Sequence, residues 1–352
     1  MSKLSHEERR KIQLTGGSTY IISLPRNWVR RTGVEKGSTL RIVQRDDLSL
    51  LIFPDDRETN SSSKEAMITS TTQDTPESIV RRMVSAYLMG YNIIKIRSLE
   101  GRLERDKRVT LKEFTRRKLV GTEILLDIPS DLTLQVLLSY KELSVKDALR
   151  RMGMIATSMH REALSSLINN DLDQAREVVA MDNDVDRFDL YIIRLLNEAV
   201  LDDRILRSIG LASPRECLAY RLITKSVERM ADHAVNIAMN NLELTLTNVD
   251  EELMNQLRSL SEFALGIFED AMKALFNEDY MMADAVLNRA QETQYRGVET
   301  IQTLVKHATP DEVSVLRLSV ESLIRTADYG SDIAEAVLNL MVKDVVAETR
   351  PE

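Results

Sequence analysis

The sequence predicts a multidomain, mainly α protein with a β-rich N-terminal domain, a small α/β module and two C-terminal three-helix bundles. Three observations lead to this fold class. Short runs of β-forming residues, separated by Gly and Pro, occupy the first 54 residues. Apolar residues recur at helical spacing from residue 144 to residue 346. Within that helical region, related segments recur 96 residues apart.

The N-terminal domain is predicted to span residues 1–54. "KIQLTGGSTYIISLP" contains a Gly-Gly turn between two short β runs and ends at Pro25. "RNWVRRTGV" then predicts a short helix or turn that ends at Gly33. "KGSTLRIVQRDDLSLLIFP" predicts a hairpin with its turn at residues 45–47. The polar, Ser/Thr-rich residues 55–75 predict a linker or mobile loop.

Residues 76–143 predict a small α/β module. "PESIVRRMVSAYLMGY" opens with Pro76, a favoured first residue of a helix, and repeats apolar residues at helical spacing. "NIIKIRS", "TEILLDI" and "LTLQVLL" predict strands, and "TLKEFTRRKLV" predicts a helix between the first two of them. The segment 81–118 is basic, with 12 Lys/Arg against 4 Asp/Glu.

The remaining helical region predicts a duplicated three-helix bundle, with one copy in residues 144–246 and the other in 247–346. "SVERMADHAVNIAMNNLEL" in the first half matches "SLIRTADYGSDIAEAVLNL" in the second, so that Asp232 and Asp328 are equivalent. Six long helices joined by short turns are expected, as in antiparallel bundles. A repeat with this period is most simply explained by duplication.

Charge and composition restrict the class of protein. The net charge is −8, yet residues 1–150 carry 27 Lys/Arg against 20 Asp/Glu, whereas the rest carries 20 against 35. That asymmetry predicts an anion-seeking N-terminal part, although solvated helix faces explain much of the C-terminal acidity. No apolar run approaches the roughly 20 residues of a membrane span. Cys217 is the single cysteine, so no intrachain disulfide is expected, and a cytoplasmic location follows.

Two pairs of carboxylates in the first bundle predict a cation site. Glu228 and Asp232 are four residues apart, and so are Asp182 and Asp186. On a helix this spacing places both members of a pair on one face, where like charges repel unless a cation lies between them. Four carboxylates from two packed helices are suited to a divalent cation. The alternative is that all four lie on a solvated helix face.

The helical region resembles the PhoU family of phosphate-uptake regulators. "AYRLITKSVERMADHAVNIA" is similar to that family's third-helix signature, and "MDNDVDRFD" is similar to its second-helix acidic motif. The resemblance implies two three-helix bundles and a divalent metal, iron, zinc or similar, on a bundle face. The metal ligands expected on this basis are Asp182, Asp186, Glu228 and Asp232.

The second bundle departs from this family pattern. Ile324 stands where the first bundle has Glu228, and Gln291 and Tyr295 stand where it has the aspartates of the second helix. Asp328 remains, with Glu292 or Glu321 as its nearest candidate helpers. One cation site at most is therefore expected in the chain.

The N-terminal domain resembles the AbrB/SpoVT/MazE group of swapped-hairpin DNA-binding domains. The residues that carry the likeness are "RKIQL", "YIISLPRNWV" and "RRTGVEKGSTLRIV". The resemblance implies an intertwined homodimer that binds DNA, as in archaeal PhoU-like regulators with such a domain. Gly17-Ser18 replaces the Gly-Arg turn common in the group, so contacts to phosphate are expected rather than base reading. The residues expected to contact DNA are Arg9, Arg10, Lys11, Ser18, Thr19, Arg26, Arg30 and Arg31.

Two functions from different classes remain open. The first is a DNA-binding transcriptional regulator of phosphate uptake, whose helical body senses metal or phosphate or docks a partner. The second is an adaptor that regulates a phosphate transporter or its sensor by protein–protein contact, without a DNA role. The basic segments 1–45 and 81–118 would then meet an acidic partner or membrane lipid headgroups. For the N-terminal domain itself, the alternative to DNA binding is a dimerisation module with solvated arginines. Enzymatic activity is not expected, because the four His residues are scattered and "TGGST" lacks the lysine of a nucleotide-binding loop.

Overall fold

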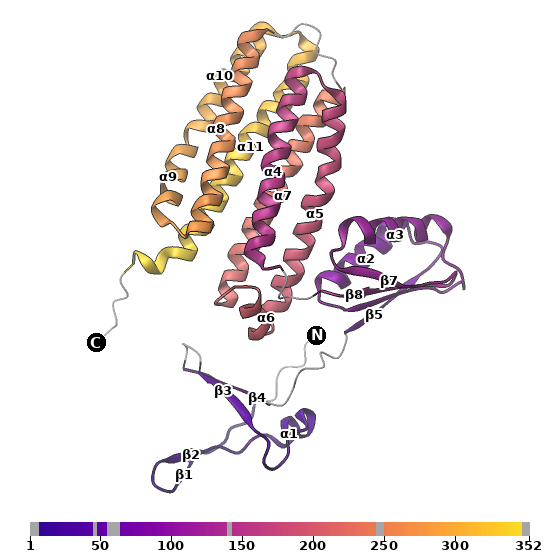
Figure 1. The fold of residues 1–352 in the computed structure, drawn as a ribbon, viewed down its shortest axis with the longest axis vertical. Helices are drawn as coiled ribbons and strands as arrows, with labels where there is room; N and C mark the ends of the chain where they lie inside the picture. The colour runs from indigo at the N-terminus through magenta and orange to yellow at the C-terminus, as the bar shows by residue number, and fades with distance from the viewer. Residues whose placement is uncertain (1–6, 45–47, 55–63, 139–142, 244–249, 347–352) are drawn as a thin grey trace. The chain divides into compact units, whose positions relative to one another are not determined.

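The chain divides into two compact units, residues 1–63 and residues 64–352 (Figure 1). The structure, a computed structural model, describes residues 7–44, 48–54, 64–138, 143–243 and 250–346. The predicted hairpin turn at 45–47 and the first part of the predicted linker, 55–63, lie outside the described residues.

The first unit consists of two antiparallel strand pairs and one short helix. β1 pairs with β2, and β3 pairs with β4. Gly16 and Gly17 have φ values of 65° and 83°, so the β1–β2 turn uses the left-handed backbone that glycine adopts without strain. The predicted Gly-Gly turn, helix and second hairpin are confirmed. The elements are β1 (Gln13–Thr15), β2 (Thr19–Ile21), α1 (Arg26–Thr32), β3 (Leu40–Gln44) and β4 (Leu50–Pro54).

The first unit has no core of its own within the described residues. None of residues 7–44 and 48–54 is buried, and Trp28, the single tryptophan of the chain, is half-buried. A domain of this size buries a small share of its surface and is only marginally stable by itself. Its apolar side chains are therefore available to a partner.

The second unit begins with the α/β module. Its sheet has the strand order β5-β6-β8-β7, with β5 parallel to β6 and the other neighbours antiparallel. Helix α2 makes the crossover between the parallel strands, and α2 and α3 lie on one face of the sheet (Figure 1). The elements are β5 (Glu65–Ser70), α2 (Pro76–Leu88), β6 (Ile93–Ser98), α3 (Arg105–Lys118), β7 (Thr122–Asp127) and β8 (Asp131–Val136).

Part of the predicted linker is a strand. Residues 65–70 form β5 at one edge of the sheet, so the module starts near residue 64 rather than at residue 76. Ile68 and Ser70 face inward, while Glu65, Met67 and Thr69 alternate with them. Ser and Thr around this strand gave it the composition of a linker, although its side chains alternate as in a half-buried strand.

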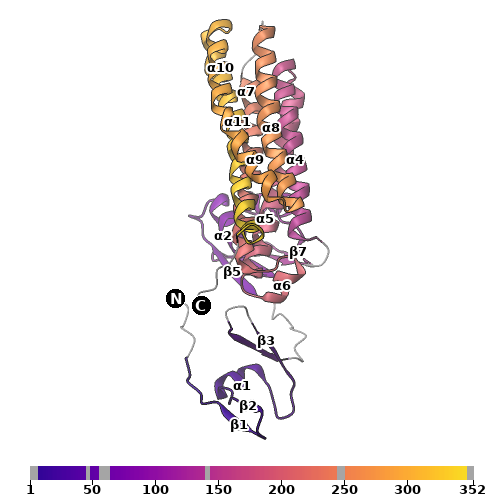
Figure 2. The same ribbon diagram turned by 90° about the vertical axis from the view of Figure 1, so that its left-hand side faces the viewer.

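The helical body has two three-helix sets packed along α7 and α11 (Figures 1 and 2). The first set is α4, α5 and α7. In the second, α8 and α11 pack with a middle helix that is interrupted at Gln291 to give α9 and α10. The helices are α4 (Val145–Asn169), α5 (Leu172–Ala199), α6 (Asp203–Ser208), α7 (Pro214–Glu243), α8 (Glu251–Asn277), α9 (Tyr280–Ala290), α10 (Glu292–His307) and α11 (Pro310–Met341).

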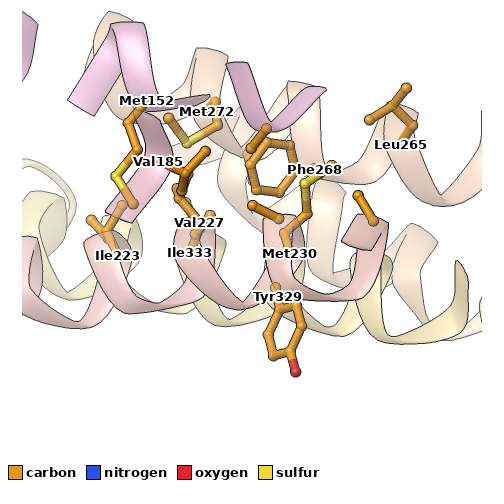
Figure 3. Close-up of a cluster of buried hydrophobic side chains, with 14 of the residues drawn as sticks. Met152, Val185, Ile223, Val227, Met230, Leu265, Phe268, Met272, Tyr329 and Ile333 are labelled. Atoms are coloured by element: carbon orange, nitrogen blue, oxygen red, sulfur yellow. The ribbon is translucent and has the colours of Figure 1, made fainter. Parts of the chain in front are cut away.

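One hydrophobic core runs through both sets of helices. Phe268, Met230 and Val185 are fully buried and come from α8, α7 and α5 (Figure 3). Gly330 allows α11 to approach α8, because a Cβ atom there would lie 2.9 Å from the backbone of Phe268. Within the described residues, no helix is long and apolar enough to cross a membrane.

Candidate functional site

The predicted metal ligands lie where α5 faces α7. Asp182 and Asp186 project from α5, and Glu228 and Asp232 project from α7. Electrostatic coupling joins the two helices: Glu228 raises the pKa of Asp182, and both Glu228 and Asp182 raise the pKa of Asp232. The packing of α5 against α7 therefore brings together the two carboxylate pairs that the sequence predicted. We call this row, together with Asp189 described below, the acidic seam.

Two of these carboxylates present buried oxygens that accept no hydrogen bond from any described residue. They are Asp182 Oδ1 and Glu228 Oε2. A buried oxygen of this kind loses its hydration without compensation, which is costly for an anion. Both oxygens can therefore coordinate a cation.

Asp189 is a fifth carboxylate of the seam, and the sequence did not predict it. It follows Asp186 by three residues, so it lies on the same face of α5. Its side chain is 8% exposed, and its Oδ1 accepts no hydrogen bond. Burial, followed by the nearby Glu228, raises its pKa from 3.8 to about 7. Asp189 is the last residue of "MDNDVDRFD", but a third acidic residue on one helix face does not by itself predict a ligand.

The pKa values of two predicted ligands are also raised. Burial, followed by Asp186, raises the pKa of Asp182. Burial, followed by Glu228, raises the pKa of Asp232 to about 6, although the residue as a whole remains exposed at the end of the seam. The ionised form of these carboxyl groups is therefore disfavoured, and a bound cation would stabilise it.

Two lysines hold carboxylates of the seam. Lys118, the last residue of α3, donates to Asp186 Oδ2. Lys225, on α7, donates to Glu228 Oε1. The side chains of Lys118 and Glu228 are 15% and 13% exposed. The seam is therefore partly neutralised from within the protein.

The seam carboxylates do not converge on a single point. Among the described residues, the ligand atoms that gather within 4.8 Å of one another belong to Asp250, Glu252 and His307, not to any three residues of the seam. Asp250 caps the start of α8, and its Oδ2 lies 3.1 Å from His307 Nδ1 at the end of α10. That group is largely exposed, and the contact between Asp250 and His307 joins two helix ends.

In the second bundle, an apolar residue stands in the position of Glu228. Ile324, the counterpart of Glu228, packs against Gly297, where a Cβ atom would lie 2.4 Å from Ile324 Cδ1. Asp328 is held by Arg325 at 2.9 Å, and Glu292 is held by Arg296 at 2.8 Å. Tyr295 is exposed. These side chains do not form a second group like the acidic seam.

The predicted DNA-contacting residues are all exposed, at three places on the first unit. One group precedes β1, the second is the β1–β2 turn and the start of β2, and the third is on α1. Arg9 lies 3.8 Å from Glu7, and Arg10 pairs with Glu8. The residues are Arg9, Arg10, Lys11, Ser18, Thr19, Arg26, Arg30 and Arg31.

The same unit exposes large apolar side chains. Tyr20 is 75% exposed and Ile12 is 67% exposed. Such a density of exposed apolar residues in a small unit marks an interaction surface. The set is Ile12, Leu14, Tyr20, Ile21, Ile22, Ile42, Leu48 and Leu50.

Family comparisons match both ends of the chain. Residues 149–240 and 257–337 match the PhoU domain model. Residues 13–60 match the model for antidote-toxin recognition MazE, bacterial antitoxin. Residues 61–148, which contain the α/β module, lie outside both matches.

Curated relatives and solved structures agree with the match in the helical body. A phosphate-specific transport system accessory protein PhoU homolog of Caulobacter vibrioides is 24% identical over 212 residues, or 57% of this chain and 88% of the relative. Its namesake from Xylella fastidiosa is 24% identical over 197 residues, or 54% of this chain and 80% of the relative.

The crystal structure of PhoU from Pseudomonas aeruginosa superposes with a TM-score of 0.50 at 20% identity, covering 57% of this chain and 96% of that one. The PhoU structure from Streptococcus pneumoniae gives 0.49 at 20% identity, covering 58% and 96%. The first of these likenesses shows that the helical body has the fold of PhoU.

Proposed function

Because the helical body of this chain belongs to the PhoU family, we propose that the protein is a regulator of phosphate uptake that binds DNA through its first unit. The presence of a PhoU body and a MazE-type domain in one chain is the observation that carries this proposal. The proposed role is regulatory rather than catalytic. The protein acts in the cytoplasm by binding duplex DNA, and the state of the helical body controls that binding.

Two features of the first unit support DNA binding. The predicted DNA-contacting cations are exposed in two groups, one before β1 and one on α1, where Arg26 and Arg30 lie one turn apart. Lys and Arg that reach phosphates release condensed counterions, so such a surface binds duplex DNA even without reading bases. Ser18 and Thr19, exposed at the β1–β2 turn, add hydroxyl donors for phosphate oxygens.

The exposed apolar residues support a homodimer formed through the first unit. Burying a large apolar side chain contributes about 1.5–3 kcal/mol, so eight of them supply ample driving force for association. A second copy of the unit supplies matching strands and matching apolar side chains. An intertwined pair then presents both sets of cations to one duplex.

The acidic seam is proposed to bind a divalent metal, iron, zinc or similar. The ligands would come from Asp182, Asp186, Glu228 and Asp232, with Asp189 as a further carboxylate. The fit rests on the buried oxygens without partners, Asp182 Oδ1, Glu228 Oε2 and Asp189 Oδ1, and on the raised pKa values. A bound dication would supply positive charge, and no redox or acid–base step is assigned to it.

The DNA-binding proposal is tested with the double variant Arg26→Ala/Arg30→Ala. We expect weaker binding to every duplex sequence and a smaller salt dependence, with the slope of log K against log [salt] falling by about 1 for each phosphate that the variant no longer neutralises. Fluorescence anisotropy with a labelled duplex, at a series of salt concentrations, measures both. Arg116→Ala/Arg117→Ala, in the α/β module, is a matched control that removes the same charge. Equal binding by the wild type and the α1 variant would refute the assignment.

The metal proposal is tested by measuring metal in the purified protein. We expect wild-type protein to retain stoichiometric metal by plasma mass spectrometry, and Asp182→Ala/Glu228→Ala to retain none. Asp250→Ala/Glu252→Ala is the control, since it removes two carboxylates elsewhere on the body. Equal metal content in the wild type and the seam variant would eliminate the site.

The alternative function is an adaptor that regulates a phosphate transporter or its sensor without touching DNA. The relatives named as accessory proteins of the phosphate-specific transport system favour it. Mapping of protein-bound DNA across the genome in phosphate-rich and phosphate-starved cells separates the two functions. Enrichment near transporter genes is expected for the DNA-binding regulator, and its absence in both conditions would favour the adaptor.

A further inference from the structure

The acidic seam receives a cation from outside the helical body. Lys118 is the last residue of α3 and belongs to the α/β module, yet its Nζ donates to Asp186 Oδ2 on α5, 68 residues later in the chain. The Lys118 side chain is 15% exposed, so the ammonium group is largely withdrawn from solvent. The module that supplies it lies outside the two matched family regions.

The position of Lys118 is fixed by the way the module docks on α5. Leu119, the next residue, is buried, and the hydroxyl of Tyr87 donates to the carbonyl of Val120 at 3.2 Å. Tyr87 lies near the end of α2, a helix that packs against α5. The backbone of Lys118 therefore cannot move far without a change in this corner of the module, whereas its side chain is held by Asp186.

The docking contact itself is buried and specific. Arg194 of α5 is 1% exposed and donates to the carbonyl of Tyr91 at 3.0 Å and to Asn92 Oδ1 at 2.9 Å. It also lies 3.5 Å from Glu198. Asn197 donates to the carbonyl of the last residue of α2 at 2.9 Å. One helix thus carries both this anchor and three carboxylates of the seam.

Lys118 stands in the place of a bound cation. Asp186 Oδ2 accepts from its ammonium group, so that oxygen is not available to ligate a metal. The ammonium also adds positive charge beside Asp182, whose pKa Lys118 lowers while the neighbouring carboxylates raise it. Within the described residues the ligand atoms of no three seam carboxylates come within 4.8 Å of one another, as expected when Lys118 and Lys225 each hold one of them.

We propose that Lys118 competes with a divalent cation for Asp186, so that cation binding at the acidic seam is coupled to the docking of the α/β module. This inference rests on the proposed cation site. In the state described, the module contributes the neutralising charge. In the cation-bound state, Lys118 leaves Asp186 and the end of α3 has one attachment fewer to α5. The α/β module is then the part of the chain that registers whether the seam is filled.

The first test measures Mn²⁺ affinity by isothermal titration calorimetry on the full chain. Lys118→Met removes the charge and keeps an unbranched side chain of similar length. We expect it to bind Mn²⁺ about tenfold more tightly than wild type, within the usual range of coupling between two ligands. Lys112→Met is the matched control, since Lys112 lies on the same helix but pairs at 2.8 Å with Asp127 inside the module. Its affinity should equal that of the wild type.

The second test needs no variant. Acetylation of lysine amines by an N-hydroxysuccinimide ester, quantified by mass spectrometry, should label Lys118 of the wild type severalfold faster when Mn²⁺ is added. The labelling of Lys112 should stay constant. Circular dichroism of each variant used in the first test verifies that the helical content is unchanged.

The outcomes separate this inference from the cation site on which it rests. Mn²⁺ binding of equal strength to wild type and Lys118→Met, or labelling of Lys118 that ignores Mn²⁺, would overturn the competition and leave the cation site standing. Failure of wild type, Lys118→Met and Lys112→Met alike to bind Mn²⁺ would overturn both.

Discussion

Replacement of Asp189 by Asn should stabilise the metal-free protein at alkaline pH. The carboxyl has a pKa of about 7 in the fold, against an ordinary value of 3.8. A carboxyl whose pKa is raised by folding makes no difference to stability below the unfolded pKa. Its contribution becomes unfavourable as the pH rises towards the folded pKa and is constant above it. Stability should therefore fall between about pH 4 and pH 7 and level off beyond.

The size of the effect follows from the pKa difference. About 3 pKa units at 1.36 kcal/mol each give an upper bound of about 4 kcal/mol, and no discount for solvent is needed because Asp189 is 8% exposed. For a domain of roughly 150–250 residues, the range into which the helical body falls, Tm changes by roughly 2–4 °C per kcal/mol. Asp189→Asn should thus melt on the order of 8 °C above wild type at pH 8.

The assay is thermal unfolding followed by far-ultraviolet circular dichroism, on protein freed of metal with a chelator, at about pH 4.5, 6 and 8, a series that runs from just above the ordinary pKa of 3.8 to above the raised pKa of about 7. The difference in Tm between Asp189→Asn and wild type should grow with pH and shrink again when Mn²⁺ is added to the wild type. Asp184→Asn, an exposed carboxylate on the same helix, is the control and should shift the Tm little at any pH. A variant less stable than wild type at the highest pH, or a difference that does not depend on pH, would refute the reasoning.

Three further predictions concern packing and assembly. Gly330→Ala should destabilise the helical body by about 1–3 kcal/mol, because the new Cβ would lie 2.9 Å from the Phe268 backbone; a lower urea midpoint with an unchanged m-value would support this, and an unchanged midpoint would contradict it. Gly90→Ala should loosen the docking of the α/β module, because φ is 80° and the Cβ would meet Glu198 Oε1 at 2.5 Å; faster hydrogen exchange in residues 87–92 is expected, and unchanged protection would count against it. Light scattering should show the proposed homodimer for the wild type, a monomer for Leu14→Glu/Ile42→Glu, and a dimer for Leu218→Glu/Leu222→Glu, which lies on an exposed face of α7. A dimer retained by the first variant would exclude the first unit as the interface.

Most of the fold could be predicted from the sequence because its signals are local. The Gly-Gly turn, the short helix before Gly33 and the repeated long helices each follow from residues close together in the chain. β5 was missed because it is a short edge strand with only three apolar residues in a row, Ala66, Met67 and Ile68, between polar segments rich in Ser and Thr. For that reason, residues 55–75, between the second hairpin and the first predicted helix of the module, were interpreted as a linker.

The acidic seam was predictable only in part, for a related reason. The four-residue spacing places Asp182 with Asp186 and Glu228 with Asp232, and packing of α5 against α7 joins the pairs. Lys118 was not predictable, because its contact with Asp186 spans two differently folded parts of the chain and has no spacing to reveal it. The burial of Asp189 likewise depends on what covers α5, which no periodicity within α5 reports.

The charges around the seam predict that the proposed site holds one divalent cation rather than two. Five carboxylates face each other across α5 and α7, and Lys118, Lys225 and Arg221 lie close enough to lower the pKa of one or another of them. At alkaline pH, where all five carboxylates are ionised, five negative charges against three positive ones leave an imbalance of two. When a dication binds and Lys118 withdraws, the imbalance falls to a single negative charge, whereas a second dication would turn it into a positive charge in a partly buried place, which is costly. Lys118→Met starts from an imbalance of three, so this variant should bind one Mn²⁺ more tightly than the wild type and should not acquire a second. A calorimetric stoichiometry of two for the variant would show that this electrostatic balance does not set the occupancy of the seam.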